Sequence, residues 1–110
     1  MERHIEIELC EPQPFIFGAN GHLGVTDGST VWIVIVTEEA MNATSRAAGA
    51  SLQTLVRHAA LYREMAEALI ARGRDQDGKV WIFEVDVAER ENSAAGGAII
   101  DGSGQTRILF

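Results

Sequence analysis

Apolar and polar positions alternate in the first third of the chain, as they do in strands whose two faces meet different surroundings. Apolar residues take every second place over residues 4–9, which predicts a half-buried strand. Pro12 and Pro14 are expected to end it, because proline has no N–H for a ladder. A Gly-Ala-Asn-Gly turn predicts two short strands within residues 15–25. Residues 30–36 form an unbroken, β-branched apolar run, typical of a central strand.

The apolar spacing changes to a helical period at Thr37. Threonine can accept a hydrogen bond from the first N–H groups of a helix, so Thr37 is expected to cap a helix over residues 38–48. Ser51 is expected to cap a second, longer helix that runs to Arg72 and stops at Gly73. The pattern therefore predicts two consecutive helices in the middle of the chain.

The tripeptide Val-Trp-Ile occurs twice, at residues 31–33 and 80–82, and a turn containing Asp-Gly precedes each copy. The segments before the two copies differ, one hairpin-like and one helical, so the copies are not units of a structural repeat. We expect two strands of one sheet, each with its tryptophan in the core. In the second strand, over residues 79–87, Trp81 then faces the core while Glu84 and Asp86 face solvent.

Together these elements predict an α+β domain over residues 1–92. Its sheet, antiparallel or mixed, is expected to have five to six strands, with the two consecutive helices packed on one face. Residues 93–110 begin as a small-residue connector and continue as a hairpin closed at residues 101–104. A lone hairpin is marginal, so this tail is expected to dock on its own sheet or on a neighbouring chain.

Composition narrows the range of functions. A length of 110 residues with 46% hydrophobic and 23% charged residues fits one globular domain. Nine basic against sixteen acidic residues give a net charge of -7, which disfavours nucleic-acid and anionic-membrane partners. The chain shows neither a signal-peptide h-region nor an apolar run of spanning length, and its single cysteine cannot form an intrachain disulfide. We therefore expect a cytoplasmic protein without a membrane partner.

The sequence offers no catalytic constellation. The three histidines and Cys10 lack the spacing of metal ligands, and Cys10 with His22 lacks a third group to orient a nucleophile and base. The glycine-rich residues 18–24 lead into a strand, whereas a phosphate loop leads into a helix. No catalytic residue, metal or cofactor is predicted, and an enzyme is the less favoured interpretation.

Two features of the long predicted helix are candidates for binding. Arg63 lies inside its main apolar stripe. Its aliphatic carbons could lie over apolar surface, or its guanidinium could form an ion pair with Glu67. The alternative is an anion-binding arginine in a pocket with Tyr62 and Trp81. A second apolar patch lies further round the helix and predicts contact with the first helix or, less favoured, with another subunit. The interface candidates are His58, Leu61, Met65, Ile108 and Phe110.

Three signatures lie between residues 31 and 87: TEEAM at residues 37–41, AEALI at 66–70 and DQDGKVWI at 75–82. With them the chain resembles a family of short bacterial proteins that is catalogued as a domain of unknown function. The resemblance implies a small α+β domain and assigns no activity or residue role.

The combined prediction is a small acidic protein that works by binding, as an interaction or accessory module and as a homodimer. One alternative is a small-ligand-binding protein or enzyme with a pocket between helices and sheet near Arg63. A further alternative is an acidic mimic that inhibits a nucleic-acid-binding protein, which requires the carboxylates to gather on one surface.

Overall fold

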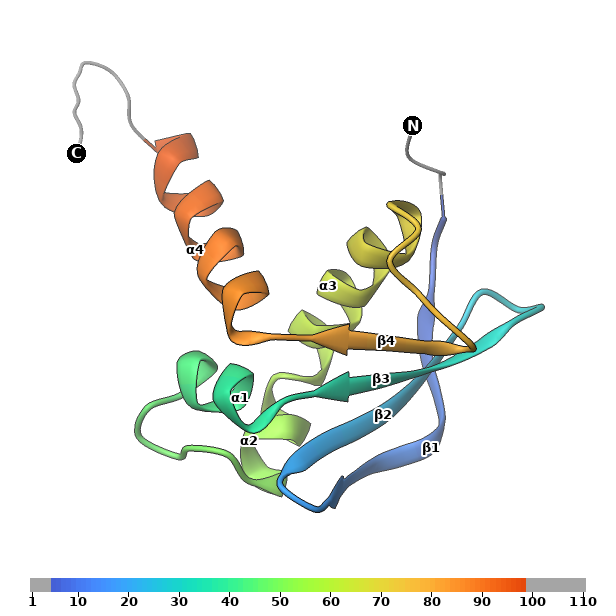
Figure 1. Cartoon of the computed structure of the whole chain (residues 1–110), viewed down its shortest axis with the longest axis horizontal. Coiled ribbons are helices and arrows are strands. Elements are labelled where there is room, and N and C mark those ends of the chain that lie inside the picture. Colours follow the sequence, from blue (N-terminus) through green and yellow to red (C-terminus); the bar gives the residue numbers. More distant parts are fainter. Residues whose placement is uncertain (1–4, 99–110) are drawn as a thin grey trace.

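A computed structural model describes residues 5–98 of the chain (Figure 1). In chain order its elements are β1 (Glu8–Phe17), β2 (Asn20–Thr26), β3 (Val31–Val36), α1 (Glu38–Thr44), α2 (Leu52–Arg57), α3 (Ala59–Ala71), β4 (Lys79–Ile82) and α4 (Glu84–Ala98). The strands form a sheet in the order β1-β2-β3-β4. Its first three strands are antiparallel, and β4 runs parallel to β3. The α+β class and the mixed sheet are confirmed.

The sheet has four strands within the described residues, fewer than the five or six expected. One reason is that the separate strands expected over residues 4–9 and from residue 15 onward are a single strand, β1. The strand predicted over residues 79–87 ends at Ile82, and α4 takes the place of its second half and of the connector. The Asp86 carboxylate accepts a hydrogen bond of 2.8 Å from the backbone N–H of Phe83, and Glu84 shares the first turn. Acids there stabilise a helix start, because they meet its free N–H groups and the positive end of its dipole. The predicted hairpin at residues 99–110 lies outside the described residues.

The expected helix caps are present, but the helices are shorter than predicted. Thr37 Oγ1 accepts from the N–H of Ala40 at 3.1 Å, and Ser51 Oγ accepts from the N–H of Thr54 at 3.2 Å. The first helix, α1, ends at Thr44 instead of residue 48. The expected long helix is divided at His58 into α2 and α3, because the backbone there leaves the helical region (φ −108°, ψ 20°).

Strand β1 passes through both prolines, so the prediction that they end a strand is wrong. Its pairing with β2 shifts between Cys10 and Phe15, where the extra residues form a bulge. Proline is tolerated there because β1 is an edge strand and a bulged segment does not need every N–H for pairing. On β2, Gly24 makes room for the bulge, since a Cβ at Gly24 would lie 2.5 Å from the carbonyl oxygen of Glu11.

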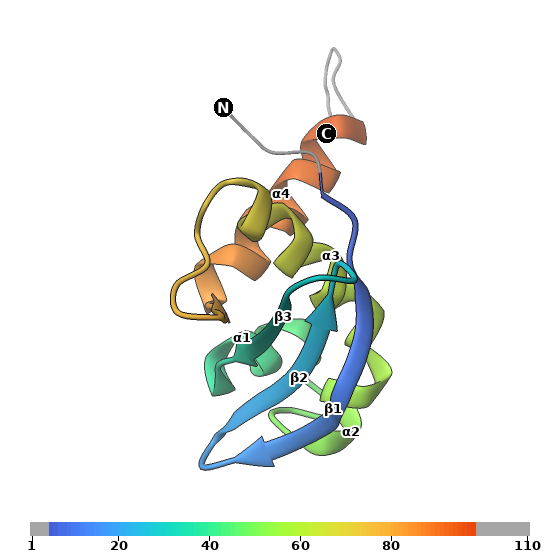
Figure 2. The same ribbon diagram turned by 90° about the vertical axis from the view of Figure 1, so that its right-hand side faces the viewer.

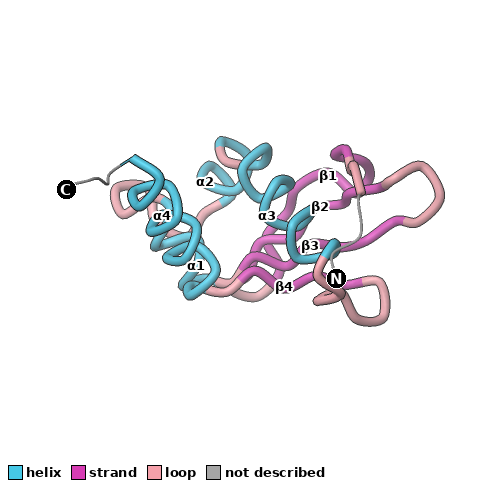
Figure 3. The backbone as a smooth tube through the Cα atoms, turned by 90° about the horizontal axis from the view of Figure 1, so that it is seen from above, coloured by secondary structure: helices cyan, strands magenta, loops and turns pink. Residues whose placement is uncertain are grey.

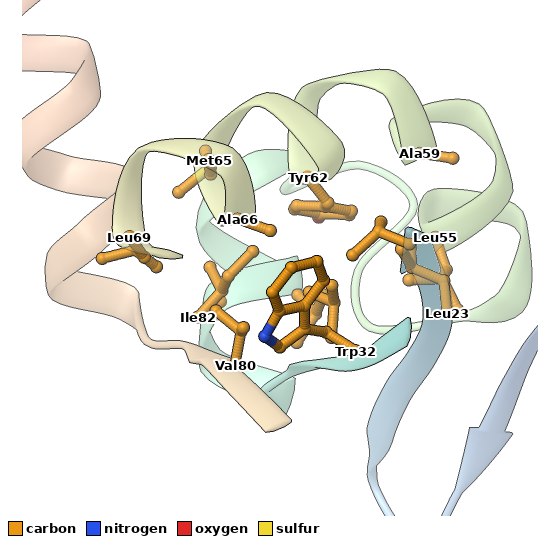
Figure 4. Packing of buried hydrophobic residues seen from close by; sticks show 14 of the residues in the cluster. Leu23, Trp32, Leu55, Ala59, Tyr62, Met65, Ala66, Leu69, Val80 and Ile82 are labelled. Atoms are coloured by element: carbon orange, nitrogen blue, oxygen red, sulfur yellow. The ribbon is translucent and has the colours of Figure 1, made fainter. Parts of the chain in front are cut away.

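The core lies between the sheet and the helices. Figure 4 shows Tyr62 of α3 pointing toward Trp32 of β3, with Leu55, Val80 and Ile82 around them. The helices gather on one side of the strands (Figure 3), and Figure 2 looks onto the other face of the sheet. None of the described helices covers that second face.

The two tryptophans of the repeated tripeptide lie on opposite faces of the sheet. Trp32 is 5% exposed and its indole N–H donates to Asp75 at 3.0 Å, as a core tryptophan requires. The prediction for Trp81 is wrong, because this side chain is 42% exposed. The parallel register pairs Val80 with the buried Val34, so Val80 and Ile82 face the core and Trp81 faces away from it.

Candidate binding surface

The predicted ligand residues Arg63, Tyr62 and Trp81 do not share a pocket. Tyr62 is fully buried in the core, and its hydroxyl donates to Thr44 Oγ1 at 2.9 Å. Trp81 lies on the opposite face of the sheet. The guanidinium of Arg63 donates to the carbonyl of Ile7 at 3.2 Å and lies 3.9 Å from a carboxylate oxygen of Glu67. Arg63 thus has partners within its own chain, as the snorkelling and ion-pair interpretations require.

Arg63 lines a cleft between α3, the start of β1 and the β2–β3 turn. The other side chains of this cleft are mostly acidic: Glu6, Glu8, Asp27 and Glu67. Carboxylates repel an anionic ligand, so the acidic side chains of this cleft oppose anion binding by Arg63. Within residues 5–98, no cluster of three or more histidine, cysteine or acidic side chains could hold a metal ion.

The predicted interface residues are largely engaged inside the chain. Met65 is buried, while His58 and Leu61 are half-buried. Leu61 packs against the core cluster, and Met65 lines a cleft between α3 and α4. Ile108 and Phe110 lie outside the described residues. The role of these five residues in an interface stays a prediction.

The sheet face without helices carries a different set of side chains, which the strand register places in rows. One row runs across all four strands and consists of Phe15, His22, Ile35 and Trp81. The next row consists of Cys10, Gly24, Ile33 and Lys79. Phe17 lies two residues beyond Phe15 on β1, opposite Asn20, and Phe83 lies two residues beyond Trp81. We call Phe15, Phe17, His22, Ile33, Ile35, Trp81 and Phe83 together the aromatic face.

The rings of the aromatic face form two groups at its opposite edges. The Phe15 and His22 rings stack with centroids 5.0 Å apart and an interplanar angle of 11°, and the Phe17 ring meets His22 edge-on at 6.1 Å. At the other edge, Trp81 and Phe83 stack at 5.9 Å and 9°. The exposed fractions are 40% for Phe15, 73% for Phe17, 42% for Trp81 and 45% for Phe83. Such pairing holds the exposed rings in fixed positions.

His22 is also unusual in its polar atoms. Its Nδ1 is buried and finds no hydrogen-bond partner among the described residues. A polar atom in this state is uncommon in folded proteins, where more than about 90% of buried polar groups are paired. The imidazole therefore serves the face mainly as a flat ring between Phe15 and Phe17.

Both edges of the sheet carry features that hinder pairing with a strand of another chain, unlike the exposed face. The β1 edge contains Pro12, Pro14 and the bulge. At the β4 edge, Gln76 and Lys79 exchange two backbone hydrogen bonds of 2.9 and 3.0 Å, and the N–H of Phe83 is held by Asp86. Prolines, bulges and covering loops are the devices that prevent a strand from pairing with another chain. Contact with a partner is therefore expected at the face and not at an edge.

The sequence carried a signal for this surface that the strand prediction missed. Phe-Ile-Phe at residues 15–17 and Trp-Ile-Phe at residues 81–83 both place aromatic rings two positions apart. Each pair must share one face of an extended segment. Because isoleucine separates the rings, both faces of the segment are apolar and the pattern does not say which one is inward.

The buried Tyr62 leads to a prediction on alkaline stability. Burial raises the pKa of Tyr62 above its ordinary value of 10.0, while the hydrogen bond with Thr44 acts in the opposite direction. The folded state therefore binds the phenolic proton more tightly than the unfolded state, so stability is lost as the pH rises above 10.0. We expect Tyr62→Phe to have a smaller alkaline loss of unfolding free energy, measured by urea denaturation. Equal losses in the two proteins would contradict this.

The same titration can be followed directly. Tyr62 is the single tyrosine of the chain, so the ultraviolet absorbance of tyrosinate reports this residue alone. We expect ionisation in the folded protein at a higher pH than in protein unfolded by urea.

Within residues 5–98, no helix combines the length and the apolar character that crossing a bilayer requires. Comparisons of the chain with family models, with curated proteins and with solved structures found no match. The resemblance over residues 31–87 therefore stays a prediction.

Proposed function

We propose that this protein is an interaction module that works by binding a partner through the aromatic face. The observation that carries the proposal is the pair of ring groups held exposed on a sheet face that no described helix covers. Exposed aromatic rings are enriched at binding surfaces, because they bury much area with little loss of conformational freedom.

The size of the surface supports the same proposal. Taking about 200 Å² for each fully exposed aromatic side chain, the four exposed rings present about 400 Å² of apolar area. The largest apolar patch of a monomeric protein is often functional and measures about 300–600 Å². The two ring groups present about 200 Å² each, and their sum lies within that range. The seven side chains of the aromatic face include no acidic, lysine or arginine side chain, in contrast to the acidic chain as a whole.

The Arg63 cleft supports the small-ligand alternative less well. Its arginine already binds a backbone carbonyl and lies beside two carboxylates, Glu64 and Glu67. A ligand would have to displace these contacts, whereas the rings of the aromatic face need no rearrangement before they meet a partner.

An apolar dye tests whether the aromatic face is open for binding. We expect anilinonaphthalene sulfonate, added to protein at submicromolar concentration, to bind this face and to bind the double variant Phe17→Ser, Phe83→Ser several-fold more weakly. Phe17 is largely exposed and Phe83 is nearly half exposed, so the urea-unfolding free energy of the variant should change by only about 1 kcal/mol.

The matched control replaces two exposed apolar residues elsewhere, Leu52→Ser and Val56→Ser on α2. This variant should keep the dye affinity of the original protein. NMR shifts induced by the dye should map to β1 and β4. Shifts that map to α2, or a Phe17/Phe83 variant as unstable as a core variant, would show that the rings serve the fold and not binding.

A further inference from the structure

We propose that residues 99–110 fold back along α4 and fill the cleft between α3 and α4, with Ile108 and Phe110 against Met65 and Ala68. This cleft belongs to the helix side of the molecule (Figure 3), so its occupant is independent of the aromatic face. The size of the cleft, the weak support of α4, and the reach and chemistry of the segment each favour this arrangement.

The cleft is small, and three apolar side chains line it from α3: Met65, Ala68 and Leu69. Figure 1 shows α3 and α4 diverging toward the C-terminal end of α4. The volume of the cleft, about 220 Å³, is below the ~300–1,000 Å³ of typical small-molecule sites. A cleft of this size accommodates one or two side chains better than a separate ligand.

Few of the described side chains of α4 hold it against the rest of the fold. Among them only Val87 is buried, and residues 88–91 are exposed. The helix also contacts α1, and Arg90 pairs with Glu64 of α3 at 2.6 Å. Its second half contains Gly96 and Gly97, each of which costs a helix about 1 kcal/mol relative to alanine. Because a helix of about 15 residues is marginal without tertiary packing, a segment lying along α4 would stabilise it.

The segment is long enough to return to the cleft. A helix rises about 1.5 Å per residue, so Ala98 lies about 14 Å beyond Glu89 along α4. Gly102 and Gly104 permit a reversal of chain direction, because glycine adopts positive φ without steric cost. The residues after Gly104, 105–110, span about 20 Å when extended, which is enough to reach the level of Glu89.

The returning part of the segment has the side chains that the α3 side of the cleft requires. Ile108, Leu109 and Phe110 are consecutive apolar residues. In an extended chain alternate side chains share one side, so Ile108 and Phe110 point together while Leu109 points away. Packing Ile108 and Phe110 on Met65 and Ala68 would bring together three of the interface candidates that the sequence predicts.

The charges of the segment and of the cleft are compatible. The segment contains one acid, Asp101, and one base, Arg107, so it carries no net charge. The cleft is likewise balanced, with two acids against two arginines: Asp86 and Glu89, Arg72 and Arg90. Because the segment belongs to the same chain, its effective concentration at the cleft is on the order of millimolar, an advantage that a separate partner lacks.

Paramagnetic relaxation tests the contact on the full chain. Cys10 is the only cysteine, so Cys10→Ser with Gln105→Cys gives one site for a nitroxide label. We expect the methyl signals of Met65 and Ala68 to lose most of their intensity, while the methyl signal of Ala19, in the β1–β2 turn, keeps it. Reduction of the label with ascorbate supplies the reference spectrum and shows that the labelled protein is folded.

Variants of the segment separate docking from mere proximity. In the same labelled background, Ile108→Ser with Phe110→Ser should restore the Met65 and Ala68 signals. Leu109→Ser is the matched control that should leave the loss unchanged. Full Met65 and Ala68 intensity before these substitutions overturns the proposal, as does a loss that the double variant does not relieve. Signal loss at Trp81 and Phe83 in place of Met65 would assign the segment to the aromatic face and also overturns it.

Mixing two preparations identifies which copy supplies the segment. One preparation carries the nitroxide and no isotope label, and the other carries the isotope label and no nitroxide. We expect the Met65 and Ala68 signals to keep their full intensity in this mixture. Loss of these signals there would mean that the segment enters the cleft of a second copy, which contradicts folding back within one chain.

Discussion

Replacing Trp32 by alanine is expected to lower the free energy of unfolding by about 3–5 kcal/mol, whereas Trp81→Ala should lower it by only about 1 kcal/mol. Both residues occupy the middle of a Val-Trp-Ile tripeptide in a strand of the same sheet. Trp32 is buried among core residues, and its removal leaves both a cavity and an Asp75 carboxylate without the indole donor. The Trp81→Ala substitution removes a ring contact with Phe83 on an exposed face and leaves no cavity in the core.

Urea denaturation of the two variants measures the difference. Each should be followed by far-ultraviolet circular dichroism, because each substitution removes one of the two tryptophans that fluorescence would report. The measurement should be made at submicromolar protein concentration, so that any association through the aromatic face does not add to the effect of Trp81→Ala. Equal losses would mean that Trp81 is part of the core and that the aromatic face is misplaced.

Gly24→Ala is expected to destabilise the protein by about 2–3 kcal/mol, more than most single changes from glycine to alanine in a strand. The new methyl group would meet the backbone of the bulge, which Pro12 and Pro14 stiffen. A backbone obstacle cannot rotate away, so the bulge must lift from β2 or the pairing of β1 with β2 must separate.

Gly21→Ala on the same strand is the matched comparison. Its new methyl group would come within 2.8 Å of Leu55 Cδ1, the end of a side chain that can change rotamer. The loss of unfolding free energy should therefore be smaller than for Gly24→Ala. If Gly24→Ala is the milder of the two, the bulge does not rest on β2.

Much of the fold could be predicted because its signals are short-range. The caps at Thr37 and Ser51 are present as expected, since each depends on a hydroxyl and an N–H three residues away. The β1–β2 hairpin and the central strand β3 also follow from local turn chemistry and β-branched content. Helix caps and tight turns depend on residues close together in the chain, so they form largely independently of the rest of the fold.

The errors after Ile82 have a physical cause. The alternation in residues 83–87 fits a strand, yet the same segment carries Asp86 where it can cap a helix at Phe83. Val87 then becomes buried in the core cluster as part of α4. The helix is favoured because the cap and this contact act together, and the contact depends on where the core lies.

The candidate site could be predicted only in part, because an aromatic-isoleucine-aromatic segment is apolar on both faces. The sequence by itself determined the α+β class, the helix starts after Thr37 and Ser51, and the fact that Trp81 and Phe83 share one side of an extended segment. Only the tertiary structure decided which side that is. Pairing β4 parallel to β3 turned Val80 and Ile82 inward and brought Trp81 into one row with Phe15, more than 60 residues away in the chain. Side-chain alternation is a property of one strand, whereas the choice between core and surface depends on which face the helices cover.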